Sequence, residues 1–137
     1  MKLIAGFFLI VSLLALSACS STASSDPQAA AEQYLQAQGE GNWEVFCDLL
    51  VPEDQEVVYR GIYRQTKKGT DCASALNLAP TMAQAQLSET TRGVQIDQVK
   101  IEGDTATIEA MTPKGPTTVP MVKVDGQWKI DLGAGAK

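Results

Sequence analysis

The chain has 137 residues, of which 11 are Lys or Arg, 16 are Asp or Glu and none is His, and its formal net charge is −5 at pH 7. An acidic balance argues against binding to nucleic acid, whose phosphates attract Lys and Arg. The lack of histidine removes the commonest general acid–base group and a usual nitrogen ligand of zinc.

An apolar run from Leu3 to Leu16 follows the single charge of Lys2 and leads through small residues to Cys19. A charged start, an apolar stretch and a small-residue end are typical of a secretory signal. The run is shorter than the roughly 20 apolar residues that a membrane-spanning helix needs. The pattern therefore predicts a signal peptide over residues 1–18.

The end of this run, Leu16-Ser17-Ala18-Cys19, resembles the lipobox of bacterial lipoproteins. In that family the cysteine thiol receives a diacylglycerol, the signal is cut before the cysteine, and the new N-terminus is often acylated. The resemblance implies that Cys19 is the lipidated first residue of the mature protein, which reaches the membrane through its lipid.

The residue after the lipidated cysteine sorts such proteins in Gram-negative cells, where an Asp retains them in the inner membrane. Ser20 stands at this position. The resemblance thus implies the outer membrane, facing the periplasm, if the source is Gram-negative. Otherwise it implies the outer face of the plasma membrane, and in both cases the cell envelope.

The mature part divides into a Ser-rich linker at residues 19–26, one domain at residues 27–133 and a tail at residues 134–137. The linker is of the flexible kind and spans about 20 Å when extended. The domain keeps an acidic balance, which disfavours a face lying flat on anionic lipid. The lipid is therefore expected to tether a domain that stays in water.

Cys47 and Cys72 remain once Cys19 is assigned to lipid. An even pair in an exported domain is usually a disulfide, and closing this loop is worth on the order of 3 kcal/mol. The alternatives are a buried thiol pair and a metal site. A zinc site lacks its usual ligands, because the chain has no His and no Cys-x-x-Cys.

Helical spacing of apolar residues runs through the first part of the domain. Asp26 and Pro27 suit a helix start, and Gly39 and Gly41 suit its end. The predicted helices are residues 27–38, 42–50, 53–66 and 70–79. Pro80 either interrupts the last of these or begins a further turn that runs through Leu87.

From Gly93 onward the apolar residues alternate with a period of two, as in strands. The predicted strands are residues 94–101, 105–110, 117–124 and 127–132. The apolar residues stand at even-numbered positions up to Ile96 and at odd-numbered positions from Val99. This one-residue slip predicts a β-bulge near Asp97 and Gln98.

Asp125-Gly126 predicts a two-residue hairpin between the last two strands. Helices followed by four sequential strands predict an α+β fold with the N-terminal helices packed on a four-stranded antiparallel sheet.

Two segments resemble the NTF2-like (cystatin-like) superfamily. Ala29–Leu50 carries an aromatic-bearing helix and a Gly-Asn-Trp bend before Leu-Leu-Val-Pro, and Ile108–Leu132 ends in Met-Val-Lys-Val-Asp-Gly-Gln-Trp-Lys-Ile-Asp. Within the superfamily the likeness is to small exported lipoproteins of the lumazine-binding-like or DUF4878 kind. The resemblance implies that a curved sheet and the helices form a cone around a pocket, and that the helical half carries a cysteine bridge.

The residues expected to line such a pocket are Tyr34, Trp43, Phe46, Tyr59, Tyr63, Asp97 and Trp128. Asp97, with a tyrosine partner, is the candidate base, since an apolar pocket raises the pKa of a carboxyl group. The alternative places Asp97 on a solvated strand face. The aromatic residues fit plain core packing as well as ligand contact.

No catalytic residue, cofactor or metal ligand set is assigned, because the sequence contains no nucleophile-elbow, P-loop or dinucleotide-binding motif. The sequence predicts a non-catalytic envelope lipoprotein that binds a partner protein or a small apolar ligand. The alternative is an NTF2-like enzyme of the isomerase or hydrolase type that uses carboxylate and tyrosine groups.

Overall fold

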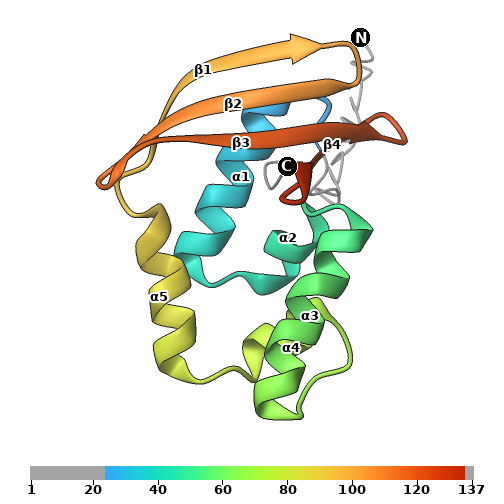
Figure 1. The fold of residues 1–137 in the computed structure, drawn as a ribbon, viewed down its shortest axis with the longest axis vertical. Coiled ribbons are helices and arrows are strands. Elements are labelled where there is room, and N and C mark those ends of the chain that lie inside the picture. The colour runs from blue at the N-terminus through green and yellow to red at the C-terminus, as the bar shows by residue number, and fades with distance from the viewer. Residues whose placement is uncertain (1–23, 135–137) are drawn as a thin grey trace, which may run out of the picture.

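The computed structural model describes residues 24–134, which form helices followed by a sheet (Figure 1). The helices are α1 (Pro27–Glu40), α2 (Trp43–Asp48), α3 (Pro52–Thr66), α4 (Cys72–Asn77) and α5 (Thr81–Thr91). The strands are β1 (Gln95–Glu102), β2 (Thr105–Thr112), β3 (Gly115–Val124) and β4 (Gln127–Ile130). The predicted signal peptide and Cys19 lie outside the described residues, as do most of the linker and the end of the tail.

The predicted α+β class is confirmed. The four strands form one antiparallel sheet in the order β1-β2-β3-β4, and the helices pack on one side of it (Figure 1). The sheet is open and does not close into a barrel.

The helix boundaries follow their capping residues. The Asp26 side chain accepts a hydrogen bond from the Gln28 backbone N–H at 3.1 Å, Pro27 takes the first helical position, and Gly41 ends α1 in the left-handed region. At α4 the Asp71 carboxylate accepts from the Ser74 N–H at 2.8 Å. That bond is the main cause of the lowered pKa of the Asp71 carboxyl.

The segment after Pro80 is a full helix, α5, where the sequence left open an interruption or a further turn. α5 buries none of its residues. It is held on α1 by the buried Gln38, whose Nε2 donates to Leu87 O and to Thr90 Oγ1, both at 2.9 Å. Ser88 Oγ donates back to Gln38 O at 3.0 Å.

The sheet confirms the predicted bulge and hairpin. The β1–β2 register shifts between Ile96 and Gln98. Asp125 (φ 51°) and Gly126 (φ 81°) form the tight turn between β3 and β4. β4 ends at Ile130, two residues earlier than predicted, and Leu132 is exposed.

The core lies between the sheet and α1, α2 and α4. Its largest fully buried side chains are Leu49, Leu50, Leu76, Ile108 and Ile130. α2 and α4 meet through Cys47 and Cys72, which stand at disulfide distance with their Cα atoms 6.0 Å apart. The two cysteines therefore lie on the second and fourth helices, as predicted.

The two edges of the sheet differ. Beside β4, the Ile130 N–H donates to Leu49 O at 2.7 Å and the Val51 N–H donates to Ile130 O at 2.9 Å. The Trp128 N–H donates to Ser24 O at 3.2 Å. Segments before α1 and before α3 therefore cover the β4 edge, whereas β1 pairs only with β2.

Candidate functional site

Four of the expected pocket residues lie in the hydrophobic core, each less than a tenth exposed. The Tyr34 and Phe46 rings stack with their centroids 5.0 Å apart, and Trp43 meets Phe46 edge-on at 5.8 Å. Trp128 is buried too, and its indole Nε1 donates to Ser25 O at 3.1 Å. These contacts make the four aromatic side chains part of the packing between α1, α2 and β4.

Tyr59 and Tyr63 lie on α3, separate from this cluster. Their ring centroids are 5.5 Å apart, and the Lys67 ammonium lies 5.8 Å from the Tyr63 ring centroid. Tyr63 is 39% exposed. The pair belongs to the surface of α3.

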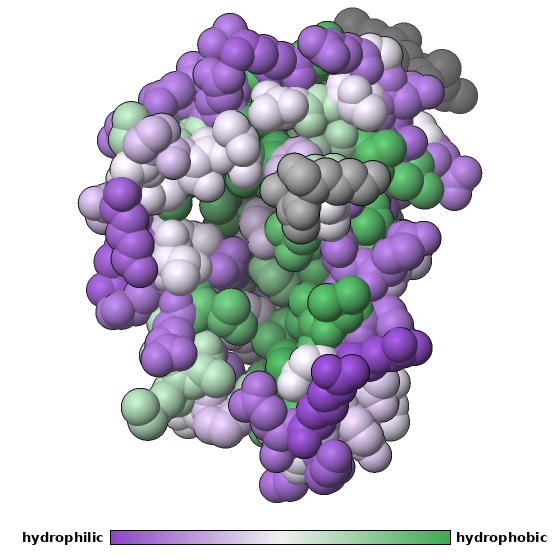
Figure 2. Space-filling view, in the orientation of Figure 1, coloured by the Kyte–Doolittle hydropathy of each residue, from purple (hydrophilic) through white to green (hydrophobic). Residues whose placement is uncertain are grey.

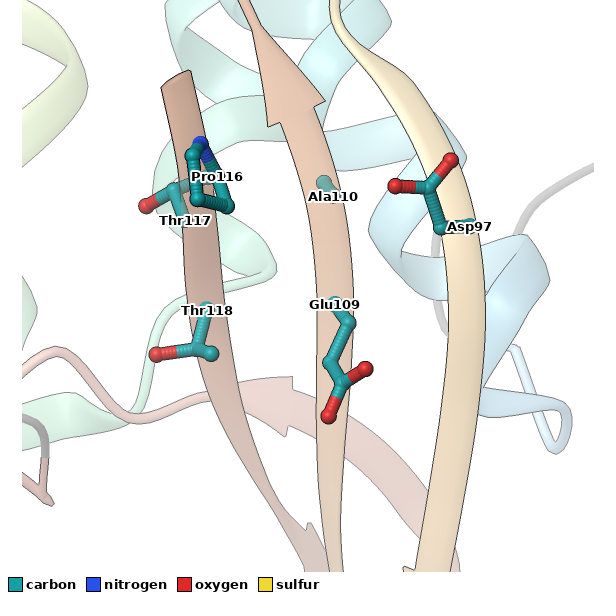
Figure 3. Close-up of a pocket in the computed structure, with 6 residues that line it drawn as sticks. All are labelled: Asp97, Glu109, Ala110, Pro116, Thr117 and Thr118. Carbon is teal, nitrogen blue, oxygen red and sulfur yellow. The ribbon is translucent and has the colours of Figure 1, made fainter.

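Asp97 is exposed at the bulge of β1 and borders a shallow depression across β1, β2 and β3 (Figure 3). The depression has a volume of about 530 Å³, and its lining is Asp97, Glu109, Ala110, Pro116, Thr117 and Thr118. Figure 3 shows the Asp97 carboxylate directed toward β2 and Glu109 lying along that strand. The Glu109 carboxylate is paired with the Lys100 ammonium.

None of the three tyrosines lines this depression. Glu109 of β2 pairs with Thr118 of β3. The neighbours of Glu109 along β2, Ile108 and Ala110, are buried toward the helices. The depression therefore lies mainly on the face of the sheet turned away from the core. Asp97 therefore occupies an open position, which fits a carboxylate on a solvated strand face and does not fit a base in an apolar pocket.

Asp54 is a buried carboxylate that is not among the residues predicted to form a site. It occupies the first turn of α3 and is 7% exposed. Its Oδ2 accepts a hydrogen bond from the Leu132 N–H at 2.6 Å. No local signal distinguishes Asp54 from Glu53, because the partner comes from a segment 78 residues later in the chain.

The pKa of the Tyr34 phenol is shifted by its position in the core. Burial, and secondly the negative charge of Asp54, raise its pKa to about 12 from an ordinary value of 10.0. The Tyr34 phenol is therefore neutral at physiological pH and cannot serve as a proton acceptor there.

Beside Asp54 a second cavity of about 480 Å³ opens at the start of α3. Its lining is Val51, Pro52, Glu53, Asp54, Val122, Val124, Asp131 and Gly133. Three of these residues carry carboxylates. Even so, within residues 24–134 no group of three or more Cys, Asp or Glu residues is arranged to hold a metal ion.

An apolar hollow lies between α3 and α5, below the sheet. Figure 2 shows hydrophobic residues gathered through the middle of this face, with hydrophilic residues around them. The half-buried apolar side chains that pack against the core from these elements are Val58, Ile62, Leu87, Ile96, Val99 and Val119. We call the apolar surface that Figure 2 shows between α3 and α5 the apolar hollow. It lies where α5 packs on α1 and α3 packs on α4, and where α3 and α5 share few or no contacts.

Three apolar side chains of the helical half are more exposed than these. Leu78 is 52% exposed, Met82 is 78% exposed and Val57 is 67% exposed. Leu78 and Met82 flank Pro80 in the connection between α4 and α5. Single exposed apolar residues are common, but these two stand close in sequence at one tip of the molecule.

In the part of the chain that the structure describes, no helix is both long enough and apolar enough to cross a membrane. No protein-family model matches the chain, and no curated protein or solved structure matches it significantly.

Proposed function

We propose that this protein is a bacterial envelope lipoprotein whose domain is non-catalytic and binds a partner protein or a small apolar ligand. The observation that supports the binding role is the apolar hollow between α3 and α5 (Figure 2), to which we assign the half-buried side chains of α3, α5, β1 and β3. Apolar surface gathered in a concavity, with polar residues around it, is typical of binding sites.

The anchoring part of the proposal rests on the likeness of Leu16–Cys19 to a lipobox. Cys19 carries the lipid, and the domain belongs on the outer membrane facing the periplasm in a Gram-negative source, or else on the outer face of the plasma membrane. Cys19→Ser yields an uncleaved or soluble form. Mass spectrometry of the purified protein that finds cleavage elsewhere and no lipid refutes the anchor.

The domain belongs with the NTF2-like cone folds in this proposal. Helices laid on one side of an open, four-stranded meander support that assignment. The enzymatic alternative needs a carboxylate and a tyrosine that converge on a substrate. Tyr34 is buried in the core, and Asp54, whose charge affects it, already accepts the Leu132 N–H.

The binding role is tested with N-phenylnaphthylamine, an apolar fluorophore that brightens on leaving water. Ile62→Ser places a hydroxyl in the apolar hollow, whereas Val57→Ser makes a similar change on an exposed part of the same helix. We expect the wild type and Val57→Ser to bind the fluorophore alike and Ile62→Ser to bind it several-fold more weakly. Equal binding by both variants, with both folded by circular dichroism, rules out the hollow as the site.

A further inference from the structure

The chain that precedes α1 is fixed to the domain before the first helix begins. The Trp128 backbone N–H donates to Ser24 O at 3.2 Å, and the Trp128 indole Nε1 donates to Ser25 O at 3.1 Å. Trp128 is itself 3% exposed. Within residues 24–134, the first contact of the chain with the domain is therefore at Ser24, on the edge of β4, and not at Asp26, the helix cap.

This contact shortens the tether that joins Cys19 to the domain. Only five residue steps separate Cys19 from Ser24, and an extended chain covers at most ~17 Å over that distance. A compact domain with the length of residues 24–134 has a radius of gyration of about 13 Å, equivalent to a sphere ~34 Å across. The tether is thus about half as long as the domain is wide.

The contact at Ser24 and the exposed apolar tip lie at opposite ends of the molecule. The Lys123 N–H donates to Asp104 O at 2.7 Å, and the Lys123 ammonium lies 5.5 Å from the Trp128 ring centroid. These contacts connect the β1–β2 turn to Trp128, and we call this region the sheet end. Figure 1 shows the sheet at one end of the long axis and the α4–α5 connection, with Leu78 and Met82, at the other. We call the latter the helical end.

We propose that the short tether keeps the domain from turning over, so that the sheet end stays toward the lipid bilayer and the helical end toward water. This inference rests on the proposed lipidation of Cys19. In the inverted orientation Ser24 stands farther from the membrane than ~17 Å of chain can reach. Leu78 and Met82 therefore cannot enter the anchoring bilayer, and a partner that covers them approaches from the aqueous compartment.

The test uses lipidated protein in phosphatidylcholine vesicles that contain a nickel-chelating lipid. Asp104→Cys and Met82→Cys each place one nitroxide label, at the sheet end and at the helical end. In the mature chain the introduced cysteine is the reactive thiol, because Cys19 carries lipid and Cys47 lies against Cys72. We expect headgroup nickel to enhance the relaxation of the label several-fold more at residue 104 than at residue 82.

The control is the same pair of labels in a chain with about 20 Gly and Ser residues inserted after Ser21. A flexible tether of that length has a root-mean-square span of ~25 Å or more, which permits the domain to turn over. The difference between the two labels should then shrink. Equal relaxation at both positions with the native tether, in protein whose lipid is confirmed by mass spectrometry, overturns the orientation. An unmodified Cys19 instead overturns the proposed anchor and the orientation with it.

Discussion

Alkaline titration of Tyr34 tests the burial of this α1 side chain in the core. The Tyr34 pKa of about 12 lies above its ordinary value of 10.0, so the folded state holds the phenol proton more tightly than the unfolded state does. The resulting stabilisation is complete below about pH 10 and is lost as pH rises toward 12. Between about pH 9 and 11 the linkage relation predicts a loss of about 1.3 kcal/mol in the free energy of unfolding.

The assay is urea unfolding at both pH values, on the wild type and on Tyr34→Phe. The substitution keeps the ring stacked on Phe46 and removes the titrating hydroxyl. Other groups that titrate in this range affect both proteins, so the difference between the two pH dependences isolates Tyr34. Asp54→Asn should lower the Tyr34 pKa, because it removes the second cause of the shift. If the wild type and Tyr34→Phe lose stability equally, Tyr34 is not buried as described.

Substitutions at three further places in the domain have expected outcomes. Replacing Cys47 and Cys72 together by Ala should lower the free energy of unfolding by about 3 kcal/mol, since the loop they close spans 25 residues; two free thiols in envelope-isolated protein contradict the bridge. Asp54→Ala should cost about 2 kcal/mol in urea unfolding, because it leaves the Leu132 N–H without its acceptor, and Asp54→Asn should cost less. Asp97→Asn should fold and complement a deletion strain like the wild type; complete loss of function in folded, lipidated protein would mean that Asp97 anchors a ligand or catalyses.

The elements that the sequence predicted well are those with local causes. Asp26 and Pro27 start α1 through hydrogen bonding and backbone geometry that involve only their neighbours. Asp125 and Gly126 adopt positive φ, which a two-residue hairpin requires whatever the rest of the fold does. The bulge between Ile96 and Gln98 was readable because the apolar alternation changes parity there.

The elements that the sequence predicted poorly have distant causes. α5 extends to Thr91 because the buried Gln38 of α1 bonds to it, and a polar contact of this kind leaves no apolar stripe in the sequence. Asp54 is buried because the chain returns to it at Leu132. Six of the seven candidate pocket residues are aromatic side chains predicted by residue type, and Asp97 is predicted by its place at the bulge; neither signal tells which face of its element a side chain occupies.

The arrangement of these residues is itself an argument for binding over catalysis. A general base is useful when a carboxylate and its partner converge on one substrate. Here Asp97 lies exposed on β1, Tyr34 lies in the core, and Tyr59 and Tyr63 lie on the surface of α3. By contrast, the half-buried apolar side chains Val58 and Ile62 of α3 and Leu87 of α5 all pack against one core. In the proposed binding role the apolar hollow takes the ligand, and in the proposed orientation the short tether keeps the helical end toward water.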